Sequence, residues 1–172
     1  MDDQAVIARV LAGERDEFEV LVQRHQKALH AFVFRQLRDR DAADEVVQMS
    51  FVRAYTNLAR FRGDASFRTW LHQIALNLCR AEWRQRRRAP QASVEEIPEP
   101  SGPSGDAGSD PRQVRLRGLV ERLPPRQRSV LAMRVYADMP FKEIAQAVGI
   151  SENSAKVNFH HAVTRLKEWL TR

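Results

Sequence analysis

The sequence has a single cysteine, Cys79, among 172 residues, and no run of apolar residues longer than four. One cysteine excludes an internal disulfide and any zinc site that needs several cysteines. The short apolar runs exclude a membrane-spanning helix, which needs about 20 apolar residues. Because the N-terminus is acidic and leads into no apolar segment, we expect no secretory signal peptide. These absences predict a protein of the reducing cytoplasm.

Signatures of catalysis are missing too. The sequence has no glycine-rich phosphate loop, and no serine, cysteine or carboxylate pair stands in a recognisable catalytic setting. His72 and Cys79 are seven residues apart, which is too far for a closed metal site without further ligands. We therefore expect no enzymatic activity, no metal, no cofactor and no small-molecule substrate.

Positive charge, by contrast, is abundant. Lys and Arg total 28 against 22 Asp and Glu, so the formal net charge is +6 and the pI is about 10.2. The net charge is −3 over residues 1–52, +7 over 53–88, −5 over 89–111 and +7 over 112–172. Such basic segments predict a polyanionic partner, and nucleic acid is the first candidate.

Composition divides the chain into two lobes, residues 1–88 and 112–172. Residues 89–111 hold five acids and no Lys or Arg, and twelve of these 23 residues are Pro, Gly or Ser. This composition is typical of a flexible linker. A coil of this length spans roughly 26 Å on average and reaches about 75 Å when extended. The lobes can therefore hold separate sites or fold against each other.

Apolar residues recur at steps of three and four along both lobes, which predicts helices and no convincing strand. The expected fold class is all-α, with two small helical domains joined by a flexible acidic linker. Ser66 and Ser151 are well placed to cap the helices that follow them. The helical segments are expected over residues 18–33, 47–58, 67–78, 112–122, 125–137, 140–148 and 151–169.

The last two predicted helices are joined by the short turn Gly149-Ile150-Ser151. Two helices joined in this way form a helix-turn-helix, whose second helix typically enters the major groove of DNA. On its outer face, Lys156 can meet a base or a phosphate and Asn158 can pair with adenine. The alternative is a helical hairpin with a solvated polar face.

On the helix that begins near Phe67, five polar and basic residues fall within about 80° of one another: Thr69, Gln73, Asn77, Arg80 and Arg84. The amides suit base edges, and the arginines, continued by 86–88, suit phosphates. A merely solvated face is the alternative. Phe67 and Trp70 lie on the apolar stripe and are expected in the core, whereas Phe61 and the turn 62–66 are free to line a pocket.

The stretch from Asp41 to Arg60 presents a different surface. Its acidic and amide residues share a face away from the apolar stripe: Asp41, Asp44, Glu45 and Gln48. An acidic patch does not favour DNA, so it indicates a protein partner. Solvated acids without a partner are the alternative.

Three stretches of the chain, in order around the linker, resemble the extracytoplasmic function (ECF) sigma factors of the sigma-70 family. Residues 41–51, DAADEVVQMSF, resemble region 2.2 of the family. Residues 61–77, FRGDASFRTWLHQIALN, resemble regions 2.3 and 2.4. The third resemblance, to region 4, is carried by LPPRQRSVL at 123–131, FKEIA at 141–145 and GIS at 149–151.

The resemblance implies that the first lobe is sigma domain 2, which docks on the clamp helices of the RNA polymerase β′ subunit and captures the melted minus-10 element. By position, the core-binding residues are Asp41, Asp44, Glu45, Gln48 and Met49, and the family commonly has an acid in place of Met49. The residues expected on single-stranded minus-10 DNA are Phe61, Arg62, Gly63, Asp64, Ser66, Thr69, Gln73, Asn77, Arg80 and Arg84.

The second lobe is implied to be sigma domain 4, which binds the flap of the β subunit and reads the duplex minus-35 element. The residues expected on this DNA are Ser151, Asn153, Ser154, Lys156, Val157, Asn158, His160, His161 and Arg165. The implied function is promoter recognition and opening for transcription initiation, with an anti-sigma factor as a further partner. A stand-alone helix-turn-helix regulator, which would bind duplex tightly without polymerase, is the alternative.

Overall fold

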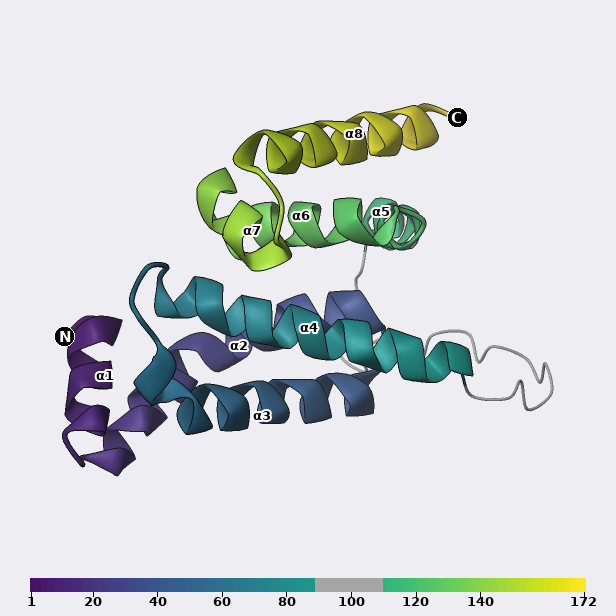
Figure 1. Ribbon diagram of the computed structural model, residues 1–172. Coiled ribbons are helices and arrows are strands. Elements are labelled where there is room, and N and C mark those ends of the chain that lie inside the picture. Colours follow the sequence, from purple (N-terminus) through teal and green to yellow (C-terminus); the bar gives the residue numbers. More distant parts are fainter. Residues whose placement is uncertain (89–109) are drawn as a thin grey trace.

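The computed structural model describes residues 1–88 and 110–172, and within these ranges it contains helices and no strand (Figure 1). The predicted all-α fold is confirmed. The linker expected over 89–111 lies outside the described residues except for its last two positions. The α-helices are α1 (Asp3–Leu11), α2 (Phe18–Leu37), α3 (Arg40–Thr56), α4 (Phe67–Arg88), α5 (Pro111–Glu121), α6 (Pro125–Val135), α7 (Phe141–Val148) and α8 (Glu152–Thr171), with 3-10 turns η1 (Arg15–Glu17) and η2 (Leu58–Arg60).

The N-terminal lobe is a bundle of α1 to α4, with α2, α3 and α4 packed against one another (Figure 1). The stripes predicted from the sequence form its core, in which Phe32 and Phe67 are the largest fully buried side chains. Ser66 Oγ accepts a 3.1 Å hydrogen bond from the Thr69 amide, so Ser66 caps α4 as predicted. Burial raises the pKa of the Cys79 thiol to about 12, which keeps this cysteine protonated and unreactive.

Helix α1 was not predicted from the apolar pattern. It is capped by Asp2, and it buries Val6, Ile7 and Val10 against the bundle. Asp3 ties it to α2, because Asp3 Oδ2 lies 2.7 Å from His25 Nε2. The His25 ring also packs beside the core, with its centroid 5.4 Å from that of Phe67.

The C-terminal lobe contains the predicted helix-turn-helix. Gly149 ends α7 in a left-handed conformation with φ of 78°, which glycine adopts without strain. Ser151 then caps α8 by accepting a 3.0 Å hydrogen bond from the Ser154 amide. Apolar side chains on the inner faces of α7 and α8 are buried or half-buried, including Ile144, Ala155 and Phe159.

The two lobes fold against each other, a choice that the sequence left open. Helix α7 lies on α4, and α6 lies on α2 (Figure 1). One apolar cluster of buried residues runs through both lobes. At the buried contact between α2 and α6, the Ser129 hydroxyl donates a 3.1 Å hydrogen bond to Gln36 Oε1.

No helix in the described parts of the chain is long and apolar enough to cross a membrane.

Candidate nucleic-acid and protein interfaces

The turn between η2 and α4 has a shape fixed by ring packing and by one glycine. Phe61 was expected to be free to line a pocket, but it is half-buried and packs on Phe67 and Trp70, with centroid distances of 6.2 and 5.0 Å. Gly63 has a left-handed φ of 75°, and a Cβ there would lie 3.2 Å from Gln4 Nε2. A larger residue at this position would strain the turn and displace Gln4.

A pocket of about 300 Å³ lies between the end of α3, η2 and α4. Its exposed polar groups are guanidiniums and an amide, and its apolar wall includes the half-buried ring of Trp70. The lining residues are Arg53, Asn57, Arg60, Trp70, Ile74 and Asn77. Aromatic rings stack on bases, amides bond base edges and guanidiniums bind phosphates. The pocket therefore combines the groups that hold an unpaired nucleotide.

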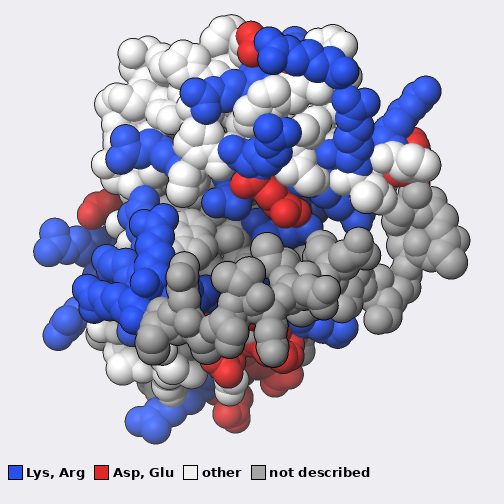
Figure 2. Space-filling model, turned by 90° about the vertical axis from the view of Figure 1, so that its right-hand side faces the viewer, with Lys and Arg blue, Asp and Glu red and all other residues white. Residues whose placement is uncertain are grey.

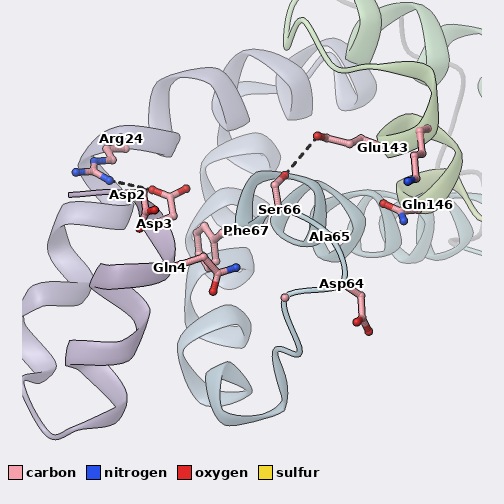
Figure 3. A pocket seen from close by; sticks show the side chains of 12 residues that line it. Asp2, Asp3, Gln4, Arg24, Asp64, Ala65, Ser66, Phe67, Glu143 and Gln146 are labelled. Carbon is pink, nitrogen blue, oxygen red and sulfur yellow. Dashed lines mark hydrogen bonds and ion pairs between the residues drawn. The ribbon is translucent and has the colours of Figure 1, made fainter.

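A larger pocket, of about 610 Å³, is lined by residues of both lobes (Figure 3). It is lined by the first residues of α1, by the turn from Gly63 to Phe67, and by Lys142, Glu143 and Gln146 of α7. The predicted residues Gly63, Asp64 and Ser66 thus face a helix of the second lobe, a neighbour that no spacing in the sequence indicated.

The predicted minus-10 residues of this region differ in accessibility. Thr69 is only 1% exposed, and Arg80 is half-buried. Both face the second lobe, since Thr69 Oγ1 lies 2.7 Å from Glu143 Oε2 and Arg80 Nη2 lies 3.4 Å from the Val148 carbonyl oxygen. The exposed members are Arg62, Gly63, Asp64, Ser66, Gln73, Asn77 and Arg84.

The arginines at the end of α4 differ in whether they form ion pairs. Arg87 and Arg88 are exposed, whereas Arg86 lies 3.1 Å from Asp39 Oδ2 and 3.0 Å from Glu82 Oε1. Arg86 was expected to serve phosphates together with its neighbours, but its pair with Asp39 also ties α4 to the start of α3, and its pair with Glu82 lies within α4. Figure 2 shows basic side chains over both the upper and the lower part of one face, so positive charge spans the two lobes.

Most of the predicted DNA surface on the outer face of α8 is exposed. Lys156 is exposed and pairs with Glu152 at 3.1 Å, one helical turn away. Asn158 Nδ2 donates a 2.8 Å hydrogen bond to the Ser154 carbonyl, which uses one of its two N–H groups and leaves the other, with Oδ1, for a contact with adenine. Ser154 and Asn158 are half-buried, and the exposed members of the set are Ser151, Asn153, Lys156, Val157, His160, His161 and Arg165.

The acidic face of α3 borders an apolar groove of about 630 Å³ between α2 and α3. Asp44 and Gln48, both predicted, line it, and Asp44 Oδ1 lies 2.8 Å from His30 Nε2. The other predicted residues, Asp41, Glu45 and Met49, are exposed along the same helix. Apolar side chains from both helices line the groove between these polar groups: Val22, Val47, Phe51 and Val52.

Several residues that line these sites were not predicted from the sequence. Arg53, Asn57 and Arg60 join Asn77 in the smaller pocket although they precede α4 in the chain. Lys27 and His30 line the groove from α2, and His30 contacts Asp44. Their residue types alone gave no signal, because each belongs to a different helix or turn from the motif it joins. Among the residues that the structure describes, no group of three His, Cys, Asp or Glu side chains can hold a metal ion.

Comparison with known protein families finds two matches along the chain. The family model "Sigma-70 region 2" matches residues 21–89, which include α2, α3 and α4. The model "Sigma-70, region 4" matches residues 113–166, which include the helix-turn-helix. Both proposed DNA surfaces and the α2–α3 groove fall within the matched segments.

Individual relatives agree with these matches. The ECF RNA polymerase sigma-E factor of Salmonella typhimurium is 34% identical over 158 residues, which cover 84% of this chain and 82% of the relative. The structure of CnrH in complex with the cytosolic domain of CnrY matches with a TM-score of 0.76 at 24% identity, covering 98% of this chain and 97% of CnrH. The sigma factor RpoE in complex with the anti-sigma factor NepR, from Bartonella quintana, matches with a TM-score of 0.73 at 19% identity, covering 90% and 97%. At these identities the two structures support the fold alone.

Proposed function

The chain belongs to the ECF-type sigma factors of the sigma-70 family, and from that premise we propose how its lobes divide the recognition of a promoter. A sigma factor directs core RNA polymerase to specific promoters and helps to open them for transcription initiation. We assign residues 1–88 to domain 2, residues 89–111 to the linker and residues 112–172 to domain 4. A stand-alone helix-turn-helix regulator is not favoured, because the similarity spans both lobes.

The pocket between α3, η2 and α4 is the observation that supports this division of promoter recognition between the lobes. Opening a duplex without ATP requires that exposed bases gain more in protein pockets than they lose from the stack, and flipping costs a few kcal/mol per base. Trp70 and Asn77 supply a ring and an amide for one base, while Arg53 and Arg60 supply charges for its phosphates. We assign capture of the melted minus-10 strand to this pocket and to the neighbouring turn.

The test is run-off transcription with core RNA polymerase, this chain and genomic promoter fragments. Transcripts that require the chain would support the proposal. No stimulation of any genomic promoter would count decisively against it. Tight binding to duplex without polymerase, together with no affinity for the β′ clamp helices, would instead support the regulator.

Replacing Asn77 by alanine should reduce open-complex formation by about 5- to 150-fold, because a bidentate contact with a base is worth about 1–3 kcal/mol. Permanganate footprinting of the melted strand measures the effect. Gln85, an exposed amide two turns further along α4, provides the matched control. Gln85→Ala should behave as wild type, and an equal loss in both variants would contradict the assignment of Asn77.

The exposed face of α8 is assigned to duplex minus-35 DNA. Lys156→Ala should weaken holoenzyme binding to promoter DNA and flatten the slope of log affinity against log salt by about 1, since one phosphate contact is removed. Titrations at several salt concentrations measure the slope. Arg15→Ala removes an equal charge from an exposed position in the other lobe and should leave the slope unchanged. An unchanged slope for Lys156→Ala would remove this lysine from the interface.

The groove between α2 and α3 suits a helical protein partner. Its apolar walls take the hydrophobic side of a helix, and Asp44 with Gln48 supply polar contacts at the rim. We assign this groove and the acidic face of α3 to the clamp helices of the β′ subunit, and we assign binding of the β flap to the second lobe.

Further partners follow from the same reasoning. RpoE of Bartonella quintana was solved with the anti-sigma factor NepR, and we propose that this chain too is held by an anti-sigma factor that competes for the polymerase-binding surfaces. Sigma factors are initiation factors, and synthesis is done by the polymerase. We propose that this chain has no catalytic activity, cofactor or small-molecule substrate of its own, and that it acts in the cytoplasm where bacterial promoters lie.

A further inference from the structure

The carboxylate of Glu143, in the second lobe, lies within hydrogen-bonding distance of donor groups of the first lobe. Glu143, in the first turn of α7, accepts a 2.7 Å hydrogen bond from the Thr69 hydroxyl. The same oxygen lies 3.3 Å from Ser66 Oγ and 3.4 Å from Arg68 Nη2. Figure 3 shows Glu143 reaching from α7 to Ser66 at the start of α4. One oxygen atom thus faces three donors from the region assigned to minus-10 DNA.

These donors are of the kind that bind phosphate. Hydroxyl and guanidinium groups form charge-assisted hydrogen bonds with phosphate oxygens as they do with a carboxylate. Ser66 and Thr69 both belong to the proposed minus-10 surface, and Thr69 is only 1% exposed beneath α7. Arg80, from the same surface, lies 3.4 Å from the Val148 carbonyl at the end of α7. Helix α7 therefore covers part of that surface with groups of negative or partly negative charge.

We propose that Glu143 is an internal competitor of promoter DNA, which holds the free chain closed until its lobes separate on the polymerase. The inference rests on the proposed function, because the surface it concerns is the one assigned to the minus-10 strand. It requires no partner protein, since every group of the contact belongs to this chain.

Promoter geometry requires the lobes to separate. By their names the two promoter elements are about 25 base pairs apart, which is roughly 85 Å of duplex at about 3.4 Å per pair. In the closed structure α7 of the helix-turn-helix packs directly on α4. The two lobes cannot hold both elements in that arrangement, so the bound chain has to be open.

The contact between the lobes also has features of one that can open. Within residues 1–88 and 110–172, the buried atoms Gln36 Nε2 and Arg128 Nε have no hydrogen-bond partner. Gln36 lies at the contact with α6, and the Arg128 guanidinium lies 6.0 Å from the ring centre of Trp83 on α4. Unpaired buried polar atoms weaken the closed arrangement. The interface in this respect resembles the more polar contacts between domains that move.

The experiment compares full-length chains without polymerase. E143Q keeps the size of the side chain and removes its charge, and E143R opposes Arg68 with a like charge. The probe is a fluorescein-labelled single strand of 20 nucleotides with mixed sequence, followed by fluorescence anisotropy. Affinity should rise about tenfold in E143Q, because the apparent dissociation constant is the intrinsic one divided by the fraction of open chain. E143R should bind at least as tightly as E143Q.

Shape provides a second readout. Small-angle X-ray scattering should give the wild type a radius of gyration near that of one compact body of this length, about 16 Å. The two variants should be larger. E168Q, which makes the same charge change at an exposed position of α8, is the matched control and should equal the wild type in both measurements. Circular dichroism verifies that the variants retain their helices.

With core polymerase, E143Q and wild type should give equal run-off transcription, since the lobes are then already apart. Suppose that E143Q and E143R both have the wild-type affinity for the single strand and the wild-type radius of gyration, while the wild type supports transcription. That result would overturn the inference and leave the proposed function standing. Failure of the wild type itself to support transcription would overturn the proposed function instead. Equal gains in E168Q and E143Q would also overturn the inference, because net charge alone would then explain them.

Discussion

Replacing Asp44 by arginine is expected to weaken binding to core RNA polymerase by roughly 30-fold or more. Asp44 lines the apolar groove between α2 and α3, beside Gln48. A partner helix in that groove would cover the carboxylate, and losing one member of a buried, hydrogen-bonded charge pair costs about 2–5 kcal/mol. The reversed charge adds repulsion. Titration of labelled chain with core polymerase measures the affinity.

Glu19→Arg serves as the matched control. Glu19 is exposed in the first turn of α2 and does not itself line the groove, and its reversal changes net charge by the same amount. It should bind core as the wild type does. The fold should survive Asp44→Arg, because the pair of Asp44 with His30 is largely exposed and such pairs contribute about 0–1 kcal/mol. Equal affinity of Asp44→Arg and wild type would contradict the docking surface.

Lowering the pH is expected to destabilise the fold through His72. This ring is fully buried in α4, 5.2 Å between centroids from Phe32, and its Nδ1 donates a 2.8 Å hydrogen bond to the Arg68 carbonyl. Burial lowers the pKa of His72 to about 4, an effect that the hydrogen bond only partly opposes. Since the unfolded chain has a pKa near 6.5, it binds a proton between about pH 6.5 and 4 that the folded chain excludes.

The unfolding free energy should therefore fall as the pH drops through this window, by up to about 3 kcal/mol in all and about 2 kcal/mol by pH 5. Urea unfolding at pH 7.5 and pH 5 measures the change. His72→Leu removes the titrating group, so the difference in unfolding free energy between the two pH values should shrink by about 2 kcal/mol. The same pH dependence in wild type and His72→Leu would show that His72 is not the group responsible.

Helices were predictable where the apolar stripe was long. The stripes of α2 and α4 repeat over several turns, so the spacing of residues such as Phe32 and Leu71 reveals the buried face. Helix α1 has nine residues and buries only three, which is too short a stripe to stand out. Its stability comes from packing on the bundle and from the contact of Asp3 with His25, which are 22 positions apart.

The binding surfaces were predictable only within single helices. The outer face of α8 and the acidic face of α3 follow from helical periodicity, and most of the residues predicted on them are exposed. The pocket between α3, η2 and α4 was not predictable, because Arg53 and Asn77 belong to different helices and meet only when α3 packs against α4. Similarly, Lys27 and His30 reach the groove from α2. Spacing along one helix carries no information about a neighbour on another.

By itself the sequence determined the helical fold, the helix-turn-helix with its Gly149 turn and Ser151 cap, and the basic and acidic character of each surface. These are local properties, set by spacing, capping and charge within a few turns of chain. Only the tertiary structure decided that α7 lies on α4, that Glu143 bonds Thr69, and that the arginines of α3 and η2 join Asn77. Those contacts depend on which apolar faces bury each other, and many pairings satisfy the same local pattern.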